Sequence, residues 1–255
     1  MKNKDVLNFF ISEAEHPFSG WDFSYINDRV VNSPLTWSYT SIILPELRKA
    51  ESLLDIGTGG GEYLSSLVPL PHHTCATEGY KPNMPIARNQ LEPLGVKIVY
   101  CKDEEMLPFA DEKFDLVINR HESYSPREVY RILKPEGVFI TQQVGDKNDS
   151  KLRLVLTGKE ELEDFVEWNL EIASNELEAN GFQIIEGYED ITSTRIFDVG
   201  AIIFYFKAIP WELPGFSIKK YYNKLVEVND YIADKGYLDL DNNNHRFLIK
   251  VKKAK

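Results

Sequence analysis

A dense glycine turn follows a short apolar run in the segment LLDIGTGGGEYL, residues 53–64. Four of five consecutive positions in this turn are glycine, and Thr58 is the exception. A glycine turn between a buried strand and a helix lets a ligand approach the main chain closely and directs the amides of the helix N-terminus at it. We therefore expect Gly57, Thr58, Gly59 and Gly61 to bind a ligand.

An acid before the turn indicates which ligand this is. A dinucleotide site of the form G-x-G-x-x-G needs a glycine where this chain has Glu62, and a carboxylate there would repel a pyrophosphate. Asp55 lies two residues before Gly57. S-adenosylmethionine carries a sulfonium and an ammonium group, and a carboxylate about 4 Å from such a charge gains about 4 kcal/mol at an effective dielectric of 20. The pattern favours S-adenosylmethionine over the nicotinamide dinucleotide of an oxidoreductase.

Further polar residues come where the next predicted strands end. Glu78 lies roughly 20 residues past the turn, where an acid accepts hydrogen bonds from ribose hydroxyls. Asp103 follows the third strand, where its carboxylate or a nearby amide would meet an adenine edge, and Asn119 lies at the end of the fourth. Because the carboxyl ends of parallel strands face one crevice, we expect these side chains to gather there.

Two candidate catalytic residues, His121 and Glu122, follow the fourth strand directly. A histidine has a pKa near neutrality, so His121 could take a proton from an attacking oxygen or nitrogen. The alternative is a surface histidine that is hydrogen-bonded to the main chain. The two other neighbouring histidines, His72 and His73, precede the second strand and should lie on the far side from the crevice. No spacing of histidine, cysteine and acid predicts a metal site.

Short apolar runs alternate with helical patterns in the middle of the chain, and this alternation predicts a parallel sheet covered on both faces. Right-handed crossovers then give a doubly wound, Rossmann-like α/β fold. The expected strands are residues 52–56, 73–78, 96–101, 114–120 and 138–144.

The terminal segments are expected to add helices and an antiparallel edge pair. The edge pair would consist of residues 182–190 and 199–209, joined by the short connection 191–198. Ser33 could cap a helix that has Pro34 at its first position. Other expected elements are helices 3–15, 62–68, 160–180 and 217–235, and a strand or tail at residues 245–253.

We divide the chain into an aromatic, helical cap segment (residues 1–50), a ligand-binding domain (51–210), and a C-terminal helix and strand (211–255) that belong to that domain or to the cap. The aromatic side chains of the first segment either pack in the core or cover the crevice and exclude water. Trp37 or Tyr39, ahead of the first strand, could touch the cofactor.

Composition narrows the class of protein. The chain has 255 residues and a net charge of −11, which disfavours sequence-independent binding to nucleic acid. No apolar run approaches the roughly 18 residues that a membrane span needs, and the acids near the N-terminus are untypical of a signal peptide. Two cysteines, Cys75 and Cys101, are consistent with a reducing compartment, so we expect a cytoplasmic protein. We expect it to be a monomer or a homodimer.

Four motifs in order resemble class I S-adenosylmethionine-dependent methyltransferases of the small-molecule type 11 sort. The motifs cover roughly residues 50–145. The resemblance implies a seven-stranded sheet whose last strand is antiparallel. It also implies that Asp55, Gly57 and Gly59 bind the methionine part. Glu78, with Gly79 beside it, would bind the ribose, Asp103 and Glu104 the adenine, and Asn119 would line the floor. The motifs are LLDIGTGGGEYL, CATEGYKPNMPIAR, CKDEEMLPFADEKFDLVINR and YRILKPEGVFITQQV.

The expected function is therefore methyl transfer from S-adenosyl-L-methionine to a small-molecule oxygen or nitrogen, with S-adenosyl-L-homocysteine as product. The chain lacks an Asn-Pro-Pro-Tyr-type motif and a cysteine after the fourth strand, which disfavours methylation of adenine N6, glutamine and cytosine C5. Two alternatives stay open: an RNA-modifying methyltransferase, and a non-catalytic protein that binds the same cofactor.

Overall fold

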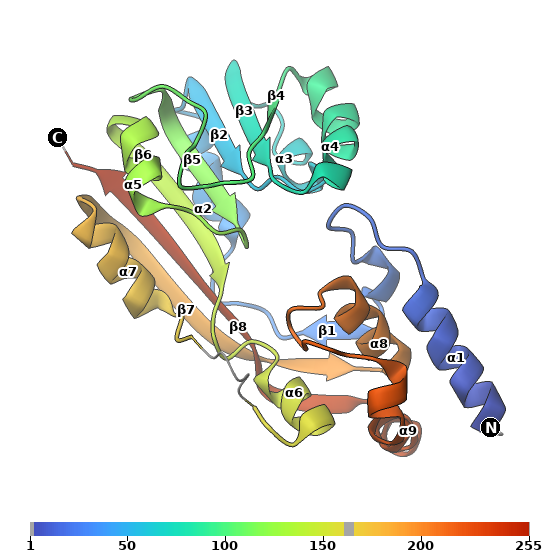
Figure 1. Ribbon diagram of the computed structural model, residues 1–255. Coiled ribbons are helices and arrows are strands. Elements are labelled where there is room, and N and C mark those ends of the chain that lie inside the picture. Colours follow the sequence, from blue (N-terminus) through green and yellow to red (C-terminus); the bar gives the residue numbers. More distant parts are fainter. Residues whose placement is uncertain (1–2, 161–165, 255) are drawn as a thin grey trace.

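A computed structural model describes residues 3–160 and 166–254 (Figure 1). Its centre is an eight-stranded sheet in the order β1-β7-β8-β6-β5-β2-β3-β4. The strands are β1 (Val30–Asn32), β2 (Ser52–Ile56), β3 (His73–Glu78), β4 (Lys97–Tyr100), β5 (Phe114–Arg120), β6 (Leu133–Val144), β7 (Phe182–Ile196) and β8 (Leu238–Lys253).

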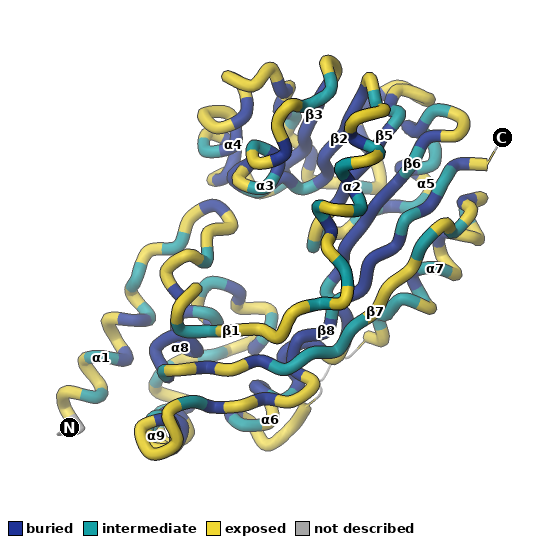
Figure 2. The backbone as a smooth tube through the Cα atoms, turned by 180° about the vertical axis from the view of Figure 1, so that it is seen from behind, coloured by how far each residue is buried: buried dark blue, intermediate teal, exposed yellow. Residues whose placement is uncertain are grey.

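The five strands β4, β3, β2, β5 and β6 are parallel neighbours, as the sequence predicts. Every residue of β2 is buried, because helices cover both faces of the sheet (Figure 2). Leu54 and Phe139 pack on the face that carries α5 (Pro126–Ile132) and α7 (Leu170–Ala179). Leu53 packs on the opposite face, which carries α2 (Tyr39–Leu47), α3 (Glu62–Ser65) and α4 (Met84–Leu91).

The antiparallel part of the sheet differs from the prediction in its arrangement. β8 is the last strand and is antiparallel, as expected, but it lies between β6 and β7 and pairs with both. β1 pairs with β7 and adds an eighth strand where seven were expected. The predicted connection 191–198 instead continues β7 as far as Ile196, because β8 offers it a partner along its whole length.

The predicted strand 199–209 is wrong, because this segment is helix α8 (Val199–Ala208). A run that is apolar on all sides suits a buried helix as well as a buried strand. Asp198 favours the helix, because its side chain caps the first turn by accepting a hydrogen bond from the amide of Ala201 at 3.1 Å. Seven of the ten residues of α8 are buried, so the helix forms the middle of a second hydrophobic cluster.

Two helix starts were also predicted wrongly. α2 begins after Ser38 rather than Ser33, because the Ser33 amide extends the β1 ladder to Ser193 and the Thr36 amide binds Asp190. α7 begins only at Leu170. Residues 166–169 are not helical, and 161–165 lie outside the described residues. The other helices are α1 (Asn3–Glu15), α6 (Ser150–Thr157) and α9 (Ile218–Lys235), with 3-10 turns at Ser24–Ile26, Lys81–Asn83 and Glu92–Leu94.

A helical cap packs around the C-terminal end of β7 and the N-terminal end of β8 (Figure 1). We define this cap as α1, residues 16–27, α8, residues 209–216 and α9. Its apolar side chains form one cluster that also includes Leu238 and Leu240 of β8. Arg29 joins two parts of it, because its Nη2 lies 2.9 Å from Glu13 Oε2 and 2.5 Å from Asp198 Oδ1. In the described part of the chain, no helix is long and apolar enough to cross a membrane.

Replacing Arg29 should destabilise the cap. We expect Arg29→Ala to lower the free energy of unfolding by about 2–4 kcal/mol, because Glu13 would be left buried without a counter-charge. Urea denaturation measures the change. The control is Lys224→Ala, which removes the exposed pair with Glu227 and should cost less than about 1 kcal/mol. Equal losses in the two variants would contradict this account of the cap.

Candidate functional site

The glycine turn after β2 is fixed to the neighbouring strand β3. The Thr58 amide donates to the Thr77 carbonyl at 2.9 Å, and the Gly57 amide donates to the Thr77 hydroxyl at 3.3 Å. Gly57, Gly59 and Gly61 have φ of 72°, 63° and 91°, which side chains rarely adopt. A Cβ at Gly61 would lie 2.7 Å from Leu91 Cγ, whereas one at Gly59 would contact only Trp21, at 3.4 Å. Gly61 therefore serves helix packing, and Gly59 keeps its side of the turn open.

Asp55, at the carboxyl end of β2, is 5% exposed. Burial raises its pKa to about 7, and the negative charge of Glu78 adds to this. Thr58 and the positive charge of Arg120 act in the opposite direction. The Thr58 hydroxyl itself is buried and has no partner in hydrogen-bonding geometry among the described residues. Beside the turn there is thus a carboxyl that titrates near neutrality and a hydroxyl with unused capacity.

Glu78 ends β3 and points back at the turn. Its Oε1 accepts a hydrogen bond from the Tyr80 amide at 2.6 Å. Burial raises its pKa, and hydrogen bonds from Tyr80, the Asn83 side chain and the amides of Gly59 and Gly79 partly offset this. A Cβ at Gly79 would lie 2.8 Å from the Cys101 carbonyl oxygen. Glycine here therefore lets β3 and the segment after β4 approach each other closely.

The two acids after β4 lie in different surroundings. Asp103 is exposed and accepts a hydrogen bond from the Glu105 amide at 3.0 Å. Glu104 is half-buried, and its charge helps to raise the pKa of Glu122. The structure therefore brings Glu104 close to the acids of the site, whereas Asp103 lies at its edge.

Asn119 and Tyr39 fix the end of β5 through hydrogen bonds. Asn119 is fully buried, and its Oδ1 accepts hydrogen bonds from Thr141 at 2.9 Å and Gln143 at 2.6 Å. Its side-chain nitrogen donates to the Ile56 carbonyl at 3.4 Å. The Tyr39 hydroxyl donates to the main-chain carbonyl of Asn119 at 2.7 Å. These bonds fix the end of β5 against the glycine turn.

The His121 side chain is held by two residues from distant segments. The Trp37 indole donates to Gln142 Oε1 at 3.1 Å, and Gln142 Nε2 lies 3.1 Å from His121 Nε2. An indole nitrogen can only donate, so the Gln142 amide presents its oxygen to Trp37 and its nitrogen to His121. His121 Nε2 must then accept this bond, and the hydrogen-bond partners thus assign the proton to Nδ1.

The surroundings keep His121 neutral. Burial lowers the pKa of the imidazole well below its usual value, and the positive charges of Arg246 and Arg120 lower it further. The backbone of His121 has φ of 62°, which is uncommon outside glycine but which histidine adopts more often than most residues. Its amide donates to the Gln142 carbonyl at 2.8 Å, which extends the pairing of β5 with β6 by one residue.

Glu122 lies directly over the glycine turn, because a Cβ at Gly57 would collide with its side chain. Its Oε1 accepts from the Ser123 amide at 3.1 Å, and its main-chain carbonyl accepts from Gln143 at 3.0 Å. Burial raises its pKa, and the charges of Glu104 and Glu78 also contribute. The structure therefore places Glu122 with the acids and His121 with the arginines.

Sequence reasoning missed several residues of this region. Gly20 packs on the glycine turn. Beside it lies Trp21, one of the aromatic residues expected in the core or over the crevice, which stacks on Trp211 at 6.1 Å and 7° between ring planes. The aromatic segment that contains Trp21 was a usable signal for this contact. Gln142 and Arg246 carried no signal, because they come from the interiors of β6 and β8.

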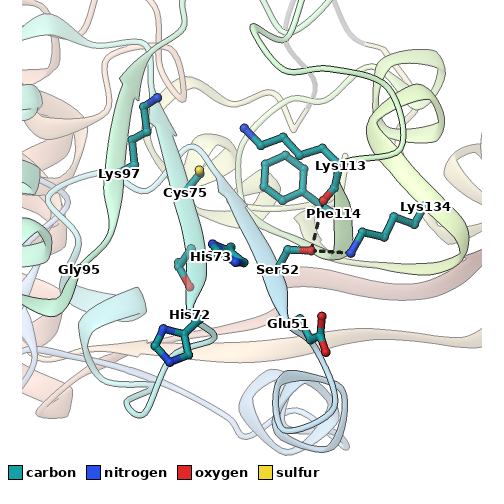
Figure 3. Close-up of a pocket in the computed structure, with 11 residues that line it drawn as sticks. Glu51, Ser52, His72, His73, Cys75, Gly95, Lys97, Lys113, Phe114 and Lys134 are labelled. Carbon is teal, nitrogen blue, oxygen red and sulfur yellow. Dashed lines mark hydrogen bonds between the residues drawn. The ribbon is translucent and has the colours of Figure 1, made fainter.

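A separate cavity of about 450 Å³ lies at the amino ends of the parallel strands, opposite the glycine turn (Figure 3). It is lined by the first residues of β2, β3, β4 and β5, and His72 and His73 lie there, as expected. None of the predicted site residues lines it. In residues 3–160 and 166–254, no group of three or more His, Cys, Asp or Glu side chains could hold a metal ion.

The chain is similar to known methyltransferases over part of its length. Residues 54–141 match the family model described as "Methyltransferase domain". The "Uncharacterized methyltransferase YcgJ" of Bacillus subtilis is 29% identical over 104 residues (37% of this chain, 41% of the relative). The "Ubiquinone biosynthesis O-methyltransferase" of Ruegeria pomeroyi is 31% identical over 117 residues (42% and 46%). The matched segments thus span less than half the length of these relatives.

Solved structures show the same fold over most of the chain. The crystal structure of the BH2331 protein of Bacillus halodurans has a TM-score of 0.60 at 18% identity, covering 86% of this chain and 99% of that one. The crystal structure of YcgJ has a TM-score of 0.57 at 19% identity, covering 85% and 98%. Residues 54–141 therefore match a methyltransferase domain, and most of the chain shares the fold of these solved structures.

Proposed function

We propose that this protein transfers a methyl group from S-adenosyl-L-methionine to an oxygen or nitrogen of a small molecule. One observation carries the proposal: Asp55, Glu78 and Glu122 surround the glycine turn without a counter-charge. Throughout residues 3–160 and 166–254, no lysine, arginine or histidine nitrogen lies within 4.0 Å of these carboxylates. Buried carboxylates are costly unless they are paired, and a cationic ligand supplies the missing charge.

The residues present fit this cofactor. The Thr58 hydroxyl lies near Asp55 without a hydrogen bond of full geometry and can bond to a ligand. Gly57 and Gly59 have positive φ and no side chain, so the turn stays open. Asp55 and the turn would hold the methionine part, and Glu78 the ribose. Gly79 would lie beside Glu78 at the ribose, and Asp103 and Glu104 on the adenine side, with Asn119 and Tyr39 as support. The bound cofactor supplies an electrophilic methyl group on a sulfonium whose leaving group is a neutral thioether.

His121 and Glu122 are the proposed residues at the acceptor. His121 stays unprotonated at neutral pH and offers its Nδ1–H as a hydrogen-bond donor. Glu122 is the better proton acceptor of the two, because burial raises its pKa toward the working pH. Most of the acceleration would come from orientation, because displacement at a methyl group needs little acid–base assistance.

The relative named for ubiquinone biosynthesis supports a small-molecule oxygen acceptor. The net charge of −11 makes an RNA substrate the weaker choice. Measured turnover of any acceptor would separate an enzyme from a protein that only binds the cofactor.

A side chain at Gly59 should block the cofactor. We expect Gly59→Leu to weaken binding of S-adenosylhomocysteine at least 100-fold in titration calorimetry, because the side chain would occupy the open side of the turn. Gly95→Leu is the matched control: Gly95 also has positive φ, 81°, but a Cβ there meets nothing within 4 Å. Wild-type affinity in Gly59→Leu, or an equal loss in Gly95→Leu, would refute the site.

Binding of S-adenosylmethionine should tighten as the pH rises from about 5.5 to about 8. The pKa of Asp55 is raised to about 7, so the carboxyl is largely protonated at the lower pH and carries no charge for the cationic ligand. Each pH unit below the pKa should weaken binding up to about tenfold. Asp55→Asn should bind more weakly and lose this dependence. A wild-type affinity that is flat over this range would argue against ion pairing at Asp55.

A further inference from the structure

The charges of the site are divided between two halves of the sheet. Asp55 and Glu78 lie at the ends of β2 and β3 and Glu104 follows β4, and these strands form one half. Glu122 follows β5 but lies over the glycine turn with these acids. Arg120 ends β5, and Arg246 lies in β8 opposite Val144 at the end of β6. The switch in charge falls between β2 and β5, beside the glycine turn. A cationic cofactor suits the first half, so the acceptor belongs to the second.

Arg246 has unused hydrogen-bonding capacity. Its Nη1 donates to Asn148 Oδ1 at 2.5 Å and to the His245 carbonyl at 2.8 Å. Over the described ranges 3–160 and 166–254, its Nε and Nη2 meet no acceptor in hydrogen-bonding geometry, and no carboxylate lies within 4.0 Å of the guanidinium. The side chain is half-buried, so these donors are only partly available to bulk water.

The acids nearest to Arg246 are already engaged with other groups. Asp149 accepts hydrogen bonds from Tyr205 at 2.5 Å and from Asn148 at 2.8 Å. Glu212 pairs with Arg153 at 3.2 Å. Both acids stabilise the charge of Arg246 at a distance, but neither bonds to it. They therefore leave the outer donors of its guanidinium available.

Arg120 and His121 face the same region. Arg120 is exposed, its guanidinium lies 4.7 Å from the centre of the Tyr63 ring, and it has no ion pair among the residues that the structure describes. Burial is the main cause that lowers the pKa of Arg246, and the positive charge of Arg120 adds a smaller effect in the same direction. His121 directs Nδ1–H away from its bond with Gln142. Arg120 is paired with Gln142 of β6 and Arg246 with Val144 of β6, and His121 bonds to Gln142, so all three lie beside the end of one strand.

We propose that Arg120, Arg246 and His121 bind an anionic oxygen group, a carboxylate or a phosphate, on the methyl acceptor. Arginine pairs with such groups through parallel N–H donors, and an anion between the two arginines would remove their mutual repulsion. The substrate class is therefore a small organic acid that carries the nucleophile on the same molecule. This inference rests on the proposed function, because it places the acceptor next to the cofactor half.

The test uses two sets of probes, each built on one carbon skeleton. The aromatic set is benzoate, phenyl phosphate and benzamide, and the aliphatic set is butyrate, propyl phosphate and butyramide. Binding to the full chain saturated with S-adenosylhomocysteine is followed by NMR. We expect an anion to bind at least tenfold more tightly than its amide, and the two anions of each set decide between carboxylate and phosphate. Arg246→Gln should remove the preference while S-adenosylhomocysteine affinity stays within twofold, and Arg120→Gln should also remove the preference.

The control is Arg195→Gln, an exposed arginine of β7 paired with Asp239, which should keep the preference. Amides that bind as well as the anions on both skeletons would overturn the inference. So would a preference that survives in both Arg120→Gln and Arg246→Gln, with an unchanged melting temperature showing that each variant is folded. Failure of the wild type to bind S-adenosylhomocysteine would instead count against the proposed function.

Discussion

The structure depends on a group of carboxylates, two buried and one half-buried, that have no cationic nitrogen within 4.0 Å among the described residues. Asp55, Glu78 and Glu122 are collected at one turn because the ends of β2, β3 and β5 meet there. Burial raises the pKa of each, so the folded chain holds these acids at a cost. The packing of the rest of the sheet must offset this unfavourable free energy. A cationic ligand would relieve that cost, so binding and folding act on the same groups.

The hydrogen bonds and ring contacts around the site orient its side chains and do not neutralise its charges. Tyr39 fixes the end of β5 through the Asn119 carbonyl, and Trp37 fixes Gln142, which in turn fixes His121. Trp21 of the cap packs on the glycine turn from the other side. The N-terminal segment therefore contacts both halves of the site. For a reaction limited by the alignment of acceptor and methyl group, rigid support of this kind is the main contribution a protein can make.

The sequence predicted the parallel half of the fold and its acids, and it did so for a physical reason. Asp55 and Glu78 lie at the ends of short buried strands, so local patterns locate them. Arg246 and Gln142 could not be found this way, because their positions depend on the pairing of β8 with β6. The segment of α8 was mistaken for a strand, because a helix buried on all sides has no polar face to show its period. The tautomer of His121 depends on three segments at once, and no single segment specifies it.

Proton release on cofactor binding tests the central claim most directly. Calorimetric titration of S-adenosylmethionine at pH 7 in two buffers of different ionisation enthalpy gives the number of protons exchanged. If the cation binds the ionised form of Asp55, whose pKa is raised to about 7, about half a proton should be released per ligand bound. Asp55→Asn should release none. Binding without proton release in the wild type would contradict the account of uncompensated acids around the glycine turn.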